Sequence, residues 1–264
     1  MLLEIKNLKT YFYGDKEPVK AVDGVSLAIG EGEILALVGE SGSGKSVTAL
    51  SVTRLLPRRN CSIESGEILF NGRDILKLNE EELRGIRGKE VAYVFQEPAT
   101  SLNPLFTVGF QLTEAITAHR RVSKRAASRE AVESLEAVGI SSAEDVVEFY
   151  PHQLSGGMKQ RAMIAMAVSM RPKLLIADEP TTSLDVTIEA QILDLLSDIR
   201  ERFGMSVLLI THDLRVARHT ADRVAVMRSG RIVEEGAVDK VFNSPSHSYT
   251  RMLIDCIPGS KERH

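Results

Sequence analysis

Short apolar runs alternate with helical patterns along most of the chain. The runs lie at residues 33–39, 90–96, 173–178, 206–211 and 223–227. Several of them are apolar at every position, which is typical of strands buried on both faces of a parallel sheet. Because such strands alternate with helices, the pattern predicts an α/β fold.

The clearest helix is predicted over residues 186–203. Asp185 is expected to cap its start, and Gly204 is expected to end it. Apolar side chains recur there at helical spacing, at Ile192, Leu195, Leu196, Ile199 and Phe203.

Two parts of the chain break the alternation. Segments 2–9, 25–29 and 67–70 are half-polar and predict shorter strands, which we expect to form a small antiparallel sheet. Residues 98–152 carry helical patterns without a convincing strand, so a helical insertion is expected at about 98–155.

Composition narrows the possible function classes. The 264 residues have a formal net charge of -3, which does not indicate a nucleic-acid binder. Cys61 and Cys256 lie far apart without a CxxC spacing, so neither a zinc site nor a disulfide framework is expected. The N-terminus does not look like a signal peptide, and no apolar run approaches the roughly 18 residues of a membrane helix. Any membrane role is therefore expected to come through a partner.

The stretch 119–130 is locally basic and allows two interpretations. It could contact nucleic acid or lipid, or it could be a solvated helix face balanced by Glu130, Glu133 and Glu136. Charge runs of this kind usually have the second explanation, which we favour.

The stretch GESGSGKS matches the P-loop pattern GxxxxGK[ST]. A strand pattern precedes it and a helical pattern follows, which favours a P-loop over a plain glycine-rich turn. Lys45 would reach the β- and γ-phosphates of a nucleotide, and the Ser46 hydroxyl would ligate Mg²⁺. The expected nucleotide-binding residues are Gly39, Glu40, Ser41, Gly42, Ser43, Gly44, Lys45 and Ser46.

Polar residues follow three of the predicted strands, where α/β sheets place their ligands. Asp178 can hold the Mg²⁺, and Glu179 is then placed to polarise an attacking water, although the pair could also cap a helix. His212 could touch the γ-phosphate or be a structural histidine. Gln96 could reach the Mg²⁺ or the water, or cap a strand end.

The stretch SGGMKQR at 155–161 begins another predicted helix without an acidic residue. Bare backbone N–H groups at Ser155, Gly156 and Gly157 suit an anion. One domain has little use for two phosphate cradles on one nucleotide. Two copies arranged head to tail would use both, because each SGG turn would cover the γ-phosphate held by the other copy.

Together these motifs resemble the nucleotide-binding subunit of an ATP-binding cassette (ABC) transporter. Residues 39–46 look like Walker A, 154–160 like the signature, 178–179 like Walker B and 183–185 like the D-loop. Gln96 looks like the Q-loop and His212 like the switch histidine. The resemblance covers about residues 1–250, leaving a short tail at 251–264.

The resemblance implies a P-loop NTPase (RecA-like) core with a small antiparallel β subdomain and a helical insertion. It implies that ATP, with Mg²⁺ held by Ser46, Gln96 and Asp178, is hydrolysed at a dimer interface. Catalysis would involve Lys45, Gln96 and His212, with Glu179 as general base. An aromatic near the N-terminus would stack on adenine, and Phe12 is our choice. The residues that would contact the partner's nucleotide are Ser155, Gly156, Gly157, Gln160 and Asp185.

Several stretches look like the peptide/nickel importer group: QEPATSLNP, LSGGMKQR, ADEPTTSLDVTIEAQIL and VFNSPSHSYTRMLI. That likeness implies two transmembrane permease subunits and an extracytoplasmic solute-binding protein. It also implies a second, related ATPase, although a homodimer stays open, and no nucleic acid. The chain would lie peripherally on the cytoplasmic face of the cell (inner) membrane, with the coupling helices of the permeases received around residues 97–106. Longer peptide-importer ATPases carry a cysteine-rich tail that can hold an iron–sulfur cluster. This chain stops at His264, so it looks like a shorter member, as nickel-type subunits often are.

Two rival functions stay open. One is a non-transport ABC ATPase acting in DNA repair or translation, although such proteins generally carry a coiled-coil insertion, zinc modules or two cassettes. The other is a regulatory module that binds ATP without hydrolysing it.

Overall fold

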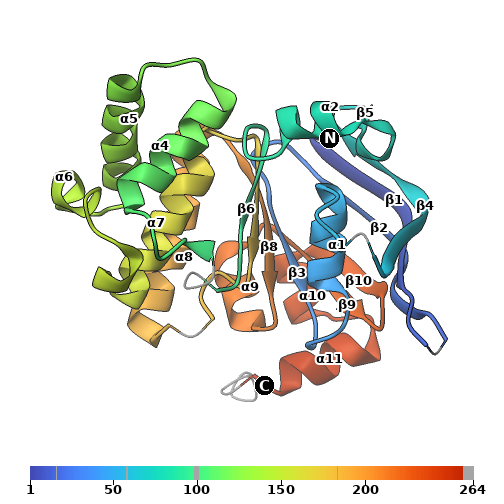
Figure 1. The fold of residues 1–264 in the computed structure, drawn as a ribbon. Coiled ribbons are helices and arrows are strands. Elements are labelled where there is room, and N and C mark those ends of the chain that lie inside the picture. Colours follow the sequence, from blue (N-terminus) through green and yellow to red (C-terminus); the bar gives the residue numbers. More distant parts are fainter. Residues whose placement is uncertain (16, 58, 98–100, 183, 258–264) are drawn as a thin grey trace. The chain divides into compact units, whose positions relative to one another are not determined.

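The computed structural model describes every residue except 16, 58, 98–100, 183 and 258–264. The chain forms two compact units, shown in Figure 1. Unit 1 comprises Met1–Leu83 and Ser206–His264, and unit 2 comprises Arg84–Met205. Helix α2 (Glu80–Ile86) runs across the boundary in sequence. Among the described residues, no helix is both long and apolar enough to cross a membrane.

Unit 1 contains the predicted antiparallel sheet, with strand order β2-β1-β4-β5. Three of its strands are longer than predicted: β1 (Leu3–Phe12), β2 (Val19–Ile29) and β4 (Cys61–Phe70). The two-residue β5 (Arg73–Asp74) was not predicted. Strand β1 is irregular between Lys6 and Lys9, where its register with β4 shifts. Asn7 has φ 48 there, and a Cβ at Gly66 would lie 2.7 Å from the Leu8 Cα. A bulge of this kind interrupts the alternation that predicts a strand from sequence.

A second group of strands in unit 1 follows the order β10-β9-β3-β8. Strand β3 is parallel to both β8 and β9, and all residues of β3 and β8 are buried, as the apolar runs predicted. The strands are β3 (Ile34–Val38), β8 (Ser206–Thr211), β9 (Arg223–Arg228) and β10 (Arg231–Ala237). The helices of unit 1 are α1 (Lys45–Val52), η1 (Ile75–Lys77), α9 (Leu214–Thr220), α10 (Val238–Asn243) and α11 (Ser248–Asp255).

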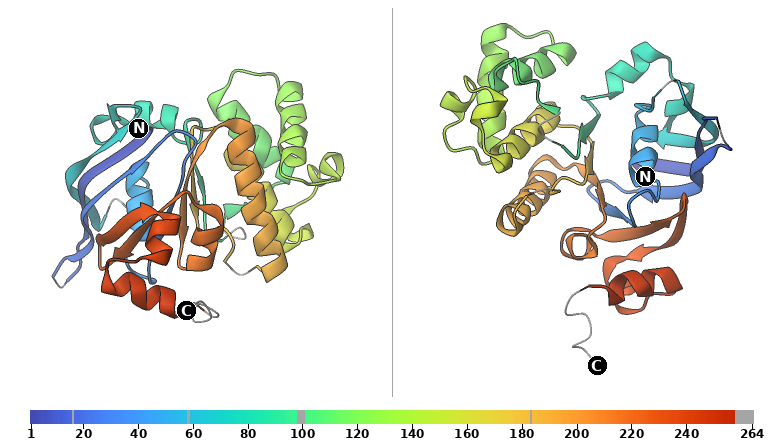
Figure 2. Two further views of the ribbon diagram at one scale, coloured as in Figure 1. Left: turned by 180° about the vertical axis from the view of Figure 1, so that it is seen from behind. Right: turned by 60° about the horizontal axis from the view of Figure 1, so that its bottom comes forward.

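Unit 2 combines a parallel strand pair with a group of helices. The strands are β6 (Val91–Val94) and β7 (Leu174–Asp178). The helices are α4 (Val108–His119), α5 (Lys124–Ala137), α6 (Ala143–Val146), η2 (Pro151–Gln153), α7 (Gly156–Val168) and α8 (Val186–Phe203). Helices α4, α5 and α7 pack against one another, as Figure 2 shows. Between residues 101 and 155 the chain is helical without a strand, as predicted, while residues 98–100 lie outside the described part.

Helix α8 spans the predicted residues. Asp185 caps it by accepting a hydrogen bond from the Ile188 N–H at 2.9 Å, and Gly204 ends it with φ 63. Ile192, Leu195, Leu196 and Ile199 are buried, so the apolar stripe faces the interior of unit 2.

Candidate functional site

The predicted P-loop joins strand β3 to helix α1 in unit 1. Gly39 has φ 153 and Gly44 has φ 107. A Cβ at Gly39 would lie 2.2 Å from the Met227 carbonyl oxygen, and one at Gly44 would lie 2.1 Å from the Ala21 carbonyl oxygen. Only glycine fits at these two positions, because any side chain would collide with neighbouring backbone.

Lys45 is buried at the first position of helix α1, with 5% of its surface exposed. Its Nζ donates hydrogen bonds to the Gly39 carbonyl at 2.8 Å and the Glu40 carbonyl at 2.9 Å. The ammonium group therefore lies inside the loop. The first turn of α1 has no acidic residue, so its backbone N–H groups and this cation favour an anion.

Two hydroxyl groups of the loop fit a phosphate and its metal ion. Ser43 Oγ is buried and has no hydrogen-bond partner within the described part of the chain. A buried hydroxyl of this kind is costly unless a ligand satisfies it. Ser46 lies exposed in the first turn of α1, where an oxygen ligand for Mg²⁺ is expected. The remaining loop residues Glu40, Ser41 and Gly42 are exposed.

His212 lies at the same edge of the strands as the P-loop. The last residues of β3 and β8, Val38 and Thr211, are register partners in a parallel pair. Gly39 and His212 therefore come next on neighbouring strands, an arrangement that the sequence alone did not predict. His212 is exposed there, so its imidazole is accessible to a ligand.

In unit 2, Asp178 ends strand β7 with 7% of its surface exposed. The Tyr93 hydroxyl donates a hydrogen bond of 2.7 Å to Asp178 Oδ2. Burial, and next the charge of Asp178, raise the pKa of Tyr93, so its hydroxyl keeps the proton that it donates. Sequence reasoning missed Tyr93, although a half-polar side chain inside the apolar run 90–96 was a visible sign.

The Glu179 carboxylate is held by two donors. Gln96 Nε2 donates to Glu179 Oε2 at 2.9 Å, and the Thr182 hydroxyl donates to the same oxygen at 3.0 Å. Glu179 has φ 46, a conformation that non-glycine residues adopt at a cost and that clusters at functional sites. The structure thus brings the predicted residues Gln96 and Glu179 together. It adds Thr182, which the sequence did not single out.

The SGG turn forms the start of helix α7. Ser155 is the N-cap, and its Oγ accepts a hydrogen bond from the Met158 N–H at 3.3 Å. Ser155 and Gly156 are exposed, and the first turn carries no acidic residue. A Cβ at Gly157 would lie 3.0 Å from Ile188 Cγ2, which explains a glycine there. The turn is an uncharged, accessible helix N-terminus and suits an anion.

Gln160 of the predicted signature lies four residues after Gly156, on the same face of α7. It is only 1% exposed, and its Nε2 has no hydrogen-bond partner among the described residues. Its contact with a partner's nucleotide stays a prediction. Asp185 is exposed but already serves as the N-cap of α8, while Ser183 of the predicted D-loop lies outside the described residues.

The structure does not distinguish Phe12 from Tyr11 or Tyr13 as the aromatic residue that would stack on adenine. Phe12 is half-buried at the end of β1, and Tyr13 is 43% exposed. The Tyr11 hydroxyl donates to Asp23 at 3.0 Å. The adenine contact through Phe12 stays a prediction.

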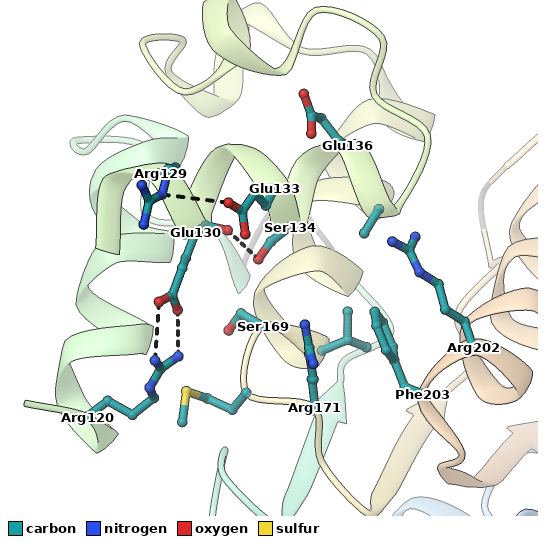
Figure 3. Close-up of a pocket in the computed structure, with 13 residues that line it drawn as sticks. Arg120, Arg129, Glu130, Glu133, Ser134, Glu136, Ser169, Arg171, Arg202 and Phe203 are labelled. Carbon is teal, nitrogen blue, oxygen red and sulfur yellow. Dashed lines mark hydrogen bonds and ion pairs between the residues drawn. The ribbon is translucent and has the colours of Figure 1, made fainter. Parts of the chain in front are cut away.

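A large cavity of about 720 Å³ lies apart from these motifs in unit 2, as Figure 3 shows. Two ion pairs line it, Arg120 with Glu130 and Arg129 with Glu133. The basic stretch 119–130 thus pairs with neighbouring acids, as the solvated-helix interpretation predicts.

A protein-family model described as "ABC transporter" matches residues 22–182. The oligopeptide transport ATP-binding protein AppD of Bacillus subtilis is 53% identical over 257 residues, 97% of this chain and 78% of that protein. The dipeptide transport ATP-binding protein DppD of Haemophilus influenzae is 48% identical, over 97% of this chain and 78% of that protein.

A solved ATP-binding cassette has a similar fold. A dimeric, post-hydrolysis state of the ATP-binding cassette MJ0796 bound to ADP and Pi superposes with a TM-score of 0.80 and 29% sequence identity. The match covers 89% of this chain and 98% of that chain.

Proposed function

Since this chain belongs to the ABC transporter family, as one of its ATP-hydrolysing cassettes, we propose that it energises the import of peptides through a membrane complex. Its fold is that of an ABC ATPase, as predicted. The observation that carries the proposal is that each unit has a helix N-terminus suited to an anion, at the P-loop and at the SGG turn. Peptides as the solute class are supported by the names of the relatives AppD and DppD, neither of which specifies nickel.

The P-loop holds the phosphates of ATP. Backbone N–H groups at the start of helix α1 and the Ser43 hydroxyl bind the phosphate oxygens, and Lys45 exchanges its two carbonyl partners for them. Ser46, Asp178 and Gln96 supply the oxygen ligands that Mg²⁺ prefers. The bound ion would neutralise charge on the β- and γ-phosphates.

Glu179 acts as the general base. Its carboxylate is oriented by Gln96 and Thr182, so it accepts the proton of the attacking water from a fixed direction. His212 stabilises the γ-phosphate from the end of β8. The reaction proceeds by positioning and charge stabilisation, with little covalent work for the protein.

ATP joins two cassettes head to tail. Ser155, Gly156 and Gly157 of one cassette bind the γ-phosphate held by the P-loop of the other. The dimeric solved cassettes support this arrangement. Gln160 and Asp185 complete the proposed contacts to the partner's nucleotide. The second cassette is either another copy or a related ATPase.

The cassette docks on two permease subunits at the cytoplasmic face of the inner membrane, and an extracytoplasmic protein delivers the solute. Exposed apolar side chains that follow Gln96 in the sequence support a docking surface: Leu105 is 78% exposed, Phe106 43% and Phe110 47%. The rings of Phe106 and Phe110 stack with centroids 4.7 Å apart. Residues 98–100 of the predicted coupling segment lie outside the described part.

A pull-down of the chain from gently solubilised native membranes, with partners identified by mass spectrometry, tests the proposal. We expect two multi-spanning subunits, a second ATPase and a solute-binding protein. Leu105→Asp should recover fewer permeases while its ATP affinity stays that of wild type. Recovery of only soluble partners, DNA or ribosomes would instead support a non-transport ATPase. A recovered complex without ATP turnover would support the regulatory module.

A further inference from the structure

Tyr249 on the C-terminal helix α11 reaches the P-loop, although the chain separates the two by about 200 residues. The Glu40 N–H donates a hydrogen bond of 3.3 Å to the Tyr249 hydroxyl oxygen. The carbonyl of the same Glu40 accepts a hydrogen bond from Lys45 Nζ. Tyr249 and Lys45 therefore hold the backbone N–H and the backbone carbonyl of one P-loop residue.

The Tyr249 side chain is buried and held by its neighbours. It is 2% exposed and belongs to a buried cluster that includes Val38, the residue directly before the P-loop. The guanidinium of Arg228 lies over its ring, 4.6 Å from the centroid. A ring held on both sides gives its hydroxyl a defined position.

Helix α11 is itself tied to strand β10. The Glu234 carboxylate accepts hydrogen bonds from the Ser246 N–H at 2.6 Å, the Ser246 hydroxyl at 2.8 Å and the His247 N–H at 3.0 Å. His247 Nδ1 then caps the helix by accepting from the Tyr249 N–H at 3.1 Å. A continuous set of contacts thus runs from β10 through α11 to the P-loop.

We propose that Tyr249 is a positioning residue for ATP binding, because its hydroxyl fixes the Glu40 peptide of the P-loop. The P-loop must keep its N–H groups directed at the phosphates, and the loop tip around Ser41 and Gly42 is exposed. A preorganised loop binds ATP more tightly because less ordering remains for the nucleotide to impose. This inference rests on the proposed role of the P-loop as the nucleotide site.

Tyr249→Phe tests the inference because it keeps the ring and removes only the hydroxyl. The loss of the contacts between this hydroxyl and Glu40 should raise the Kd for ATP about 3- to 10-fold. Tyr249 does not touch the reacting atoms, so KM should rise while kcat at saturating ATP stays within about 2-fold of wild type. Met252→Ala, at a 47% exposed position of the same helix, is the control and should leave both values unchanged.

The outcomes separate this inference from the proposed site. An unchanged Kd in Tyr249→Phe would overturn the role of Tyr249, whatever happens to Tm. A fall in kcat with an unchanged KM would also overturn it. A wild-type chain that does not bind ATP at all would overturn the proposed nucleotide site itself.

Discussion

Gln96 and Glu179 are joined by a hydrogen bond of 2.9 Å from the Gln96 side-chain amide to Glu179 Oε2. Gln96 lies two residues after strand β6, at the start of the segment that leads to Leu105 and Phe106. Glu179 directly follows strand β7. The proposed general base is therefore held by the same segment that we propose contacts the permeases. This contact gives a physical route by which movement of the permeases can change the position of the base.

Replacement of Gln96 by Ala should impair hydrolysis more than binding. Glu179 would lose the hydrogen bond from Gln96 and would be less well oriented. We expect kcat to fall about 10- to 100-fold with ATP affinity nearly unchanged. Steady-state ATPase assays and equilibrium titration of ATP measure the two values. Thr182→Val, which removes the other donor, should act in the same direction. A raised Kd with an unchanged kcat would contradict this role.

Lys45→Ala should remove most of the ATP affinity. The substitution takes a buried cation out of the P-loop and leaves the carbonyls of Gly39 and Glu40 without this donor. We expect a Kd raised about 30-fold or more. Lys77→Ala, a change at an exposed lysine of the same unit, is the matched control. Retained nanomolar-to-micromolar affinity in Lys45→Ala would count against the P-loop assignment.

Tyr93→Phe should weaken the response to Mg²⁺. Without the hydroxyl, Asp178 loses the donor that fixes its Oδ2. Loss of a group that orients a metal ligand typically costs about 10-fold or more in metal affinity. ATP binding titrated in the presence and absence of Mg²⁺ separates the two effects. The affinity should fall only when Mg²⁺ is present. An equal loss without Mg²⁺ would indicate a general effect on the fold.

Because the pKa of Glu234 is lowered, we predict that the folded state loses stability in acid. Burial alone would raise the pKa of Glu234, but the Thr250 hydroxyl together with hydrogen bonds from Ser246 and His247 outweighs burial and lowers it to about 2, from an ordinary value of 4.5. The folded state thus favours the carboxylate, so this stabilisation is complete above pH 4.5 and is lost as the pH falls towards 2.

Glu234→Gln tests the acid effect. It should lower Tm at pH 7 by about 2 °C, a modest value because the carboxylate is close to solvent. The difference from wild type should shrink as the pH falls below 4.5, where the unfolded wild-type chain begins to take up the proton. Thermal unfolding followed by circular dichroism across this range provides the measurement. A difference that is independent of pH would contradict the assignment.

Local sequence patterns predicted the bounds and caps of several helices and strands, because these features depend on residues that are close in the sequence. The bounds of helix α8 and strand β8, the Asp185 cap and the Gly204 end follow from spacing and capping chemistry. The sequence also placed Gly39, His212, Gln96 and Glu179 at the ends of strands, but it did not predict that Gln96 would contact Glu179.

Contacts between distant parts of the chain could not be predicted in this way. Tyr93 and Asp178 are 85 residues apart, and Tyr249 and Glu40 are 209 apart. Their meeting depends on how complete elements pack, which no local window contains. Gln160 shows the same limit, because its polar side chain suggests exposure while the packing of α7 buries it.

The central claim is that the SGG turn binds the anion of a partner cassette, and Gly156 allows a direct test. Gly156 is exposed, and a Cβ there would meet Leu184 Cδ2 at an ordinary 3.7 Å. Gly156→Asp should therefore fold, since an acid at a helix N-terminus is favourable, yet it should repel the partner's γ-phosphate. Gly156→Asn has nearly the same shape without the charge and is the matched control.

The measurement is the molecular mass with and without ATP in a Glu179→Gln background, where ATP should bind without being hydrolysed. The chain is measured alone and mixed with the second ATPase recovered from the membrane complex. We predict an ATP-dependent dimer that persists with Gly156→Asn, even if weakened, and disappears with Gly156→Asp. Two results would contradict the account. One is a chain that stays monomeric with ATP, both alone and with the second ATPase. The other is a Gly156→Asp variant that dimerises as well as its parent.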